Sequence, residues 1–213
     1  MATGLRERKK AQTRELIAET ARQLFSERGF ERVSVAEIAR VADVSEKTVF
    51  NYFPTKEDLV YWRMESFIEE ELLTRIRERA PGESVLAAFG RFAREPRGML
   101  ADNDPQTRQR LAALTRMIAD SPSLLAREQQ IFAGYTASLA ELLADETGAG
   151  DDDVEPWVVA NALMGVHRRL IDFTRAHVLA GARHSELARE VLAQADAALA
   201  RLERGLGDYA VRS

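Results

Sequence analysis

The sequence contains no cysteine, and this absence excludes several kinds of chemistry. A chain without thiols forms no disulfide framework, no thiolate zinc site and no cysteine nucleophile. The three histidines are His167, His177 and His184, and the chain has neither a glycine-rich phosphate loop nor a serine in a nucleophile elbow. Gly181 is expected to end a helix between His177 and His184, so we interpret these two as surface residues. We expect no enzymatic activity, no cofactor and no metal.

Long apolar runs are also missing. No uninterrupted stretch approaches the roughly 20 apolar residues that a membrane-spanning helix needs. The first ten residues are polar and lack the apolar segment of a signal peptide. With 46% hydrophobic and 30% charged residues, the 213-residue chain has the balance of a globular protein with one large or two small domains. We therefore expect a cytoplasmic protein that does not contact a membrane.

The chain has a small excess of negative charge, but one end of it is basic. The net charge is -4, whereas residues 1–14 carry +4 and residues 1–56 carry +3, which leaves -7 for residues 57–213. A basic end and an acidic body suggest two different partners. The basic arm from Arg6 to Arg14 either strengthens binding to a polyanion through counterion release or is a disordered, solubilising tail. Both interpretations stay open.

Every convincing periodicity is helical, so the fold class is all-α. Gly29 is placed to end a first helix, and Ser34 with Glu37 forms a capping box that starts a second. Ser45 caps a short third helix that Pro54 ends. A long fourth helix follows from Thr55 towards Arg79. Further helices are expected over residues 84–95, 105–119, 122–145, 156–180 and 185–206.

The third helix holds polar residues opposite Val49 and Phe53. A long helix, a short capped helix, a tight turn and a second short helix form the layout of a helix-turn-helix module, whose last helix lies in the DNA major groove. Lys47 suits guanine, Asn51 suits adenine and Glu46 suits cytosine. An ordinary helical hairpin with a solvated polar face has the same helix lengths, so lengths alone do not decide.

A longer segment favours the helix-turn-helix module over the ordinary hairpin: VSVAEIARVADVSEKTVFNYFPTKEDLV, residues 33–60. It resembles the DNA-binding signature of the TetR family of bacterial transcriptional regulators, over about 45 residues from near Thr13 to Leu59. The resemblance implies about nine helices, with a DNA-binding domain over residues 1–54 and a ligand-binding and dimerisation domain over residues 55–213. It also implies a repressor that leaves a palindromic operator when a small-molecule effector binds. As a hypothesis, the effector moves the fourth helix and changes the separation of the two recognition helices.

Residue by residue, the resemblance implies contacts with base edges and phosphates at eight positions: Ser34, Ser45, Glu46, Lys47, Thr48, Asn51, Tyr52 and Lys56. Phe50 departs from the pattern, because the family often has a tyrosine there. Phenylalanine cannot donate a hydrogen bond, so we interpret Phe50 as core or as an apolar contact with a thymine methyl group. It is not among the predicted contacts.

The resemblance implies that the C-terminal part binds the effector and forms a homodimer. Candidate pocket residues are aromatic, methionine or polar residues within apolar helices: Phe89, Phe92, Met117, Phe132, Tyr135, Asn161, Met164 and His167. The same pattern is typical of plain core, and a neighbouring helix can satisfy a buried Asn161 or His167 as well as a ligand can.

Two apolar stripes favour dimerisation through the last two helices, although an intramolecular core would produce them too. They are Val159, Leu163, Val166, Leu170 and Phe173 on one helix, and Leu187, Val191, Ala195, Ala198, Leu202 and Leu206 on the other. Two further functions remain open for this fold: an adaptor that binds proteins, and a protein that sequesters a small molecule without reading DNA.

Overall fold

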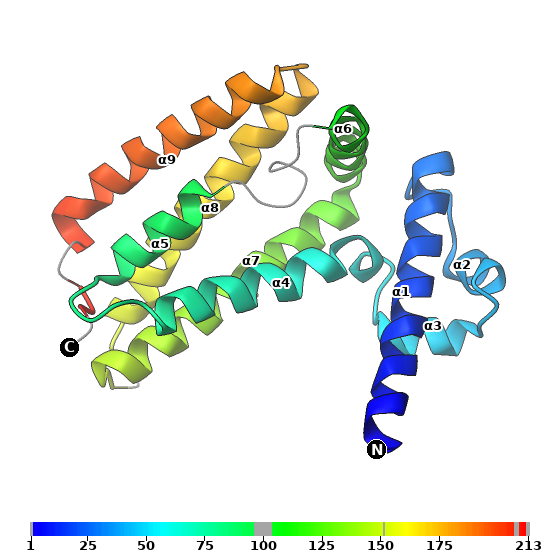
Figure 1. The fold of residues 1–213 in the computed structure, drawn as a ribbon, viewed down its shortest axis with the longest axis horizontal. Helices are drawn as coiled ribbons and strands as arrows, with labels where there is room; N and C mark the ends of the chain where they lie inside the picture. The colour runs from blue at the N-terminus through cyan, green and yellow to red at the C-terminus, as the bar shows by residue number, and fades with distance from the viewer. Residues whose placement is uncertain (1, 96–103, 151, 207–208, 212–213) are drawn as a thin grey trace. The chain divides into compact units, whose positions relative to one another are not determined.

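The computed structural model describes residues 2–95, 104–150, 152–206 and 209–211, and all regular structure within these ranges is α-helical. The all-α prediction is therefore confirmed. The described helices divide between two compact units, each built around its own core (Figure 1). Across the described residues, no helix combines the length and apolar character that crossing a membrane requires.

The first unit comprises Met1–Glu65 and Arg116–Glu128. It contains α1 (Ala2–Arg28), α2 (Val35–Val41), α3 (Glu46–Tyr52) and the beginning of α4 (Asp58–Arg77). Ile17, Ala21 and Phe25 of α1 are buried. They recur at helical spacing and pack one face of α1 into the core. Because α1 is helical from Ala2, the basic arm is a continuation of this helix and not a disordered tail.

Local hydrogen bonds at the helix termini shape the first unit. Gly29 ends α1 with φ +82°, a left-handed conformation that glycine adopts without a Cβ clash. The Ser34 hydroxyl accepts from the backbone N–H of Glu37 at 3.2 Å and so caps α2. Before α4, the backbone N–H of Thr55 donates to Asp58 Oδ2 at 2.8 Å, and the N–H of Asp58 donates to Thr55 Oγ1 at 3.3 Å. The predicted cap at Ser34 and the reciprocal capping box of Thr55 and Asp58 are confirmed, whereas the Glu37 carboxylate pairs with Arg28.

A turn from later in the chain completes the first unit. It joins the end of α6 (Pro105–Ala119) to the start of α7 (Pro122–Thr147). The Tyr61 hydroxyl donates to the Leu124 carbonyl at 3.1 Å, and Arg127 Nε donates to Asp58 Oδ1 at 2.7 Å. The unit therefore extends beyond residue 54, where the sequence places a domain boundary.

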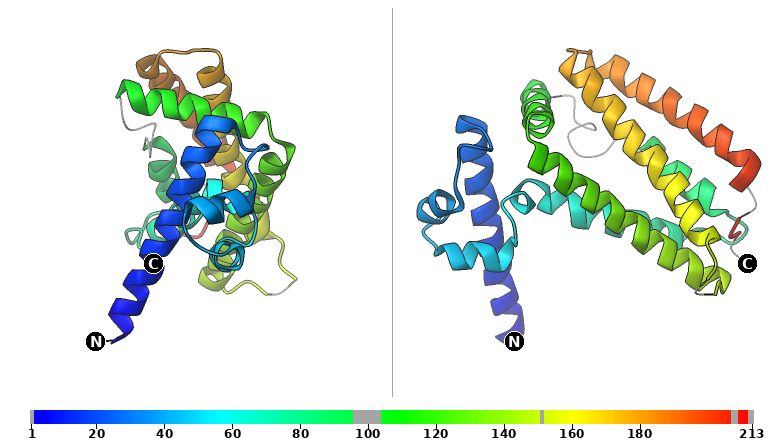
Figure 2. Two further views of the ribbon diagram at one scale, coloured as in Figure 1. Left: turned by 90° about the vertical axis from the view of Figure 1, so that its right-hand side faces the viewer. Right: turned by 180° about the vertical axis from the view of Figure 1, so that it is seen from behind.

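The second unit comprises Ser66–Thr115 and Gln129–Ser213. Here α5 (Val85–Arg94) packs against α8 (Glu155–Leu179) and α9 (His184–Leu206), which lie side by side in Figures 1 and 2. Arg79 is 2% exposed and fully hydrogen-bonded. Its guanidinium donates to both carboxylate oxygens of Glu146 at 3.0 and 2.6 Å, and to the carbonyls of Ile76, Glu83 and Ala210. This one side chain thus joins the end of α4, α7 and the C-terminal residues.

The two predicted dimer stripes belong only in part to the core of a single chain. The stripe residues that stay partly exposed are Val166, Phe173, Val191, Ala198, Leu202 and Leu206. Leu187 and Ala195 of α9 are buried, as are Val159, Leu163 and Leu170 of α8. The reason is that α9 packs on α5 and α8 within the same chain. One chain therefore accounts for the buried residues of the stripes, and the dimer interface through α8 and α9 stays a prediction.

Candidate nucleic-acid interface

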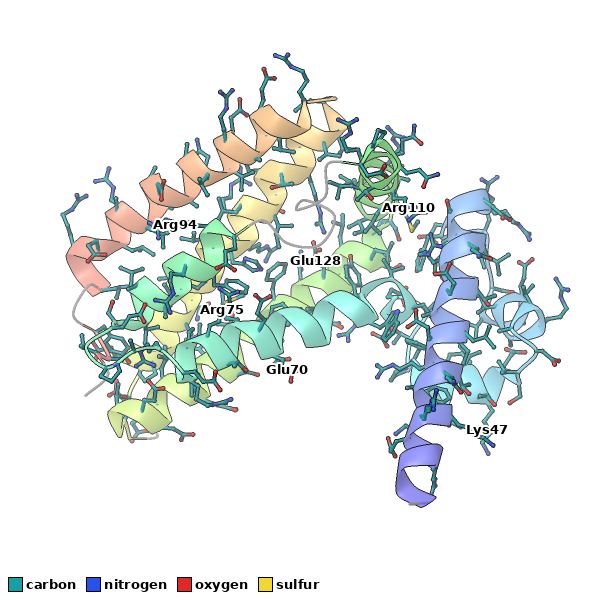
Figure 3. The ribbon with its side chains drawn as sticks, in the orientation of Figure 1. Lys47, Glu70, Arg75, Arg94, Arg110 and Glu128 are labelled. Carbon is teal, nitrogen blue, oxygen red and sulfur yellow. The ribbon has the colours of Figure 1, made fainter. Side chains whose placement is uncertain are left out.

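Short as it is, α3 has one buried face and one open face. Val49 and Phe53 are each 1% exposed and fix the helix to the first unit, whereas Lys47 and Asn51 are exposed on the opposite side. Lys47 is labelled in Figure 3, below α3 in that view. A lysine and an asparagine one turn apart offer hydrogen-bond donors to guanine and adenine edges.

The hydroxyls at the start of α3 hold the helix terminus. Ser45 Oγ accepts from the backbone N–H of Thr48 at 3.1 Å and lies 2.8 Å from Thr48 Oγ1. Each hydroxyl has one donor and two acceptor sites, so these bonds leave room for a further partner. Glu46 is exposed beside them, and Tyr52 is partly buried at the other end. In the neighbouring helix, the exposed Ser34 likewise caps its own N-terminus.

Phe50 is the residue of this surface that the sequence reasoning left out. Its side chain is 46% exposed, next to Lys47 on the helix surface, so the core interpretation is wrong. An exposed apolar ring beside two exposed polar side chains has the character that suits the methyl group of thymine. The signal available in the sequence was the position of Phe50, one residue after the buried Val49.

Lys56 has a different environment from the other predicted contacts. Its ammonium donates to the backbone carbonyls of Phe30 at 2.9 Å and Val33 at 3.2 Å, and it lies 4.0 Å from the centroid of the Phe30 ring. These contacts use two of the three ammonium hydrogens. They tie the turn before α4 to the loop that leads into Ser34, so Lys56 holds the start of α2 in place.

The predicted effector residues form a ring cluster in the second unit. His167 of α8 lies with ring centroids 5.4 Å from Phe92 of α5 and 5.9 Å from Phe132 of α7. Phe132 also contacts Tyr135 at 5.9 Å, and Phe92 contacts Phe89 at 6.2 Å. Three helices thus contribute to one largely aromatic core.

The three remaining pocket candidates, Met117, Asn161 and Met164, make no ring contact with this cluster. Met164 is buried. Asn161 is exposed, and its amide donates to the Trp157 carbonyl one turn earlier at 2.8 Å. Met117 belongs to the first unit. Asn161 is therefore not buried, and its own helix supplies a hydrogen-bond partner without a ligand.

A separate hollow of about 330 Å³ opens between α6 and the turn from α8 to α9. The described residues that line it are Pro105, Arg108, Gln109, Leu111, Ala112, Val178, Gly181, Ala182 and Leu187, and the predicted pocket residues are not among them.

A capped three-helix module with an exposed polar recognition helix defines a helix-turn-helix DNA-binding protein. Comparison with known proteins agrees. Residues 17–61 match the family model of bacterial regulatory proteins of the tetR family, and residues 79–207, more than half of the chain, match the MftR C-terminal domain. The chain belongs to the TetR family of bacterial regulators and is a DNA-binding transcriptional regulator.

Individual relatives carry names of the same kind. The chain is 29% identical over 168 residues to the HTH-type transcriptional regulator TcmR of Streptomyces glaucescens, covering 78% of this chain and 74% of that protein. It is 27% identical over 165 residues to the Mycobacterium tuberculosis protein named as the mycofactocin biosynthesis transcriptional regulator MftR, covering 75% and 78%. A TetR-family structure from Mesorhizobium loti matches the fold with a TM-score of 0.51 and 22% identity, over 90% of this chain and 96% of that one.

Proposed function

We propose that the protein is a homodimeric repressor that reads a palindromic operator with α3 and leaves it when a small molecule binds the second unit. The observation that carries the DNA-reading part is the open face of α3. Lys47, Phe50 and Asn51 are exposed together on a helix whose opposite face is locked by Val49 and Phe53. Glu46, Thr48 and Tyr52 flank them, and Ser34 and Ser45 present two capped helix N-termini to phosphates.

Dimerisation is proposed through the outer faces of α8 and α9. These faces expose large apolar side chains to solvent in the single chain: Val154, Trp157 and Val158 near the start of α8, and Leu192 on α9. Trp157 is 49% exposed and Val158 57%. A second copy would cover them, and a two-fold dimer matches the two half-sites of a palindrome.

The effector is proposed to bind where α5, α7 and α8 bring Phe92, Phe132 and His167 together. Aromatic walls with an imidazole suit a small, largely apolar molecule with a polar group. Binding releases DNA only if the effector has a higher affinity for the conformation that does not fit the operator. The helix α4 begins in the first unit and ends in the second, which supports it as the element that changes.

The test is selection of a random duplex pool against the purified, ligand-free protein at moderate salt. Enrichment of one palindrome is expected, with half-sites about one helical turn apart. The variant Lys47→Ala is the sharpest companion, because its exposed side chain should alter preference at one position of each half-site. A folded dimer that enriches no sequence would contradict the proposal and favour the adaptor or the sequestering protein.

A further inference from the structure

The basic start of α1 has a defined orientation, because Arg14 is anchored. The Arg14 guanidinium carbon lies 5.3 Å from the Trp62 ring centroid and 5.5 Å from the Phe53 ring centroid. Phe53 is the C-cap of α3, and Trp62 belongs to α4. Cation–π contact with these two rings means that the Arg14 side of α1 faces the junction of α3 and α4.

Two further cations share that side of the helix. Residues four apart lie close to one face of an α-helix, so Lys10 is rotated by about 40° and Arg6 by about 80° from Arg14. Arg8 is rotated by about 120° in the opposite sense and lies on another face. Lys9 is three residues from Arg6, rotated from it by about 60°, and borders the same side of the helix. At 1.5 Å per residue, Lys10 and Arg6 are about 6 and 12 Å further along the axis than Arg14. The side chains of Arg6, Arg8, Lys9 and Lys10 are all exposed.

The position of this face fits a contact outside the groove that α3 reads. Figures 1 and 2 show α1 continuing past α3 towards its N-terminus. Within the described residues, no carboxylate forms an ion pair with Arg6 or Lys10. Arg14 is already stacked on the rings of Phe53 and Trp62, so Arg6 and Lys10 are the cations of this side that we consider for a contact with DNA.

We propose that Arg6 and Lys10 grip the phosphate backbone next to the groove segment occupied by α3. Their helix is continuous with the core helix of the first unit, so the two charges are presented in fixed register and not on a flexible tail. The inference rests on the proposed DNA-reading function and assigns its partner as the sugar-phosphate backbone. Such a contact adds affinity and salt dependence without adding base preference.

A charge-matched pair of single variants tests this proposal. Arg6→Ala removes one arginine from the proposed face, and Arg8→Ala removes one arginine from another face of the same helix. Lys10→Ala is the second variant of the proposed face. Binding of each variant is measured from 50 to 200 mM salt on the selected operator and on a duplex of random sequence. Alanine favours helix, so circular dichroism should stay the same in all three.

For a dimer, loss of one phosphate contact per protomer should reduce the steepness of the log–log salt plot by about 1.8 on both duplexes for Arg6→Ala, and likewise for Lys10→Ala. Arg8→Ala should keep most of the wild-type slope. Equal reductions for Arg6→Ala and Arg8→Ala, or no reduction for Arg6→Ala, would overturn the proposal. Because the random duplex is included, the result is decisive even if the wild type enriches no operator, which would refute the proposed function separately.

Discussion

Lys56, which precedes α4 by two residues, can either hold the loop before α2 in place or bind a DNA phosphate. Replacing it by methionine separates these two roles. The methionine keeps an apolar stem of similar length but removes the ammonium. The carbonyls of Phe30 and Val33 then lose donors at 2.9 and 3.2 Å. At about 1 kcal/mol net for each hydrogen bond, the free energy of unfolding should fall by about 2 kcal/mol. For a chain of this size, that is a decrease of about 4–8 °C in melting temperature.

The same substitution should affect DNA binding, because Lys56 holds the loop from Phe30 to Val33. Val33 directly precedes the Ser34 cap of α2, so a loosened loop should weaken binding to every sequence. The number of phosphate contacts would not change, and the salt dependence of binding should stay the same. Thermal unfolding by circular dichroism and binding by fluorescence anisotropy at several salt concentrations measure the two effects.

Lys47→Met is the matched control, because Lys47 is exposed and should alter base preference without altering the melting temperature. One result would refute the positioning role of Lys56. If Lys56→Met kept the wild-type melting temperature but made the salt dependence shallower by about 1.8, each protomer would have lost one phosphate contact. Lys56 would then bind phosphate, as the family resemblance implies.

Three further outcomes are expected. Phe50→Ala should leave the melting temperature unchanged and abolish a preference for thymine over uracil at one position of each half-site, measured with uracil-substituted duplexes; an unchanged preference would exclude the methyl contact. Glu146→Ala should lower the free energy of unfolding by about 3–5 kcal/mol, because Arg79 is left buried without its carboxylate, whereas the exposed Glu141→Ala should have little effect in the same denaturant titration. Trp157→Glu should yield a monomer in sedimentation equilibrium at concentrations where the wild type is a dimer, and a persistent dimer would move the interface elsewhere.

The helix termini could be predicted from the sequence because their stabilising contacts are local. Ser34 caps an N–H three residues later, and the reciprocal bonds between Thr55 and Asp58 span three residues as well. A short-range pattern therefore contains both partners. The recognition helix could be placed for the same reason.

Contacts between distant residues could not be predicted in this way. The carbonyls that take up the Lys56 ammonium belong to residues 26 and 23 positions earlier, and nothing near Lys56 in the sequence points to them. The stripe containing Leu187 and Ala195 has the periodicity of a buried face, but periodicity does not say whether the covering helix comes from the same chain. The exposure of Phe50 and Asn161 likewise depends on how neighbouring helices pack.

The turn between α6 and α7 gives the first unit an unusual order of synthesis. Asp58 and Tyr61 are translated long before Arg127 and Leu124, their hydrogen-bond partners. At about 5–20 residues per second, the ribosome needs roughly 3–13 seconds to proceed from the first segment of this unit to the end of the second. During that interval the nascent chain displays its DNA-reading helix on an incomplete support. A chain that stops before residue 116 would remain in this state permanently.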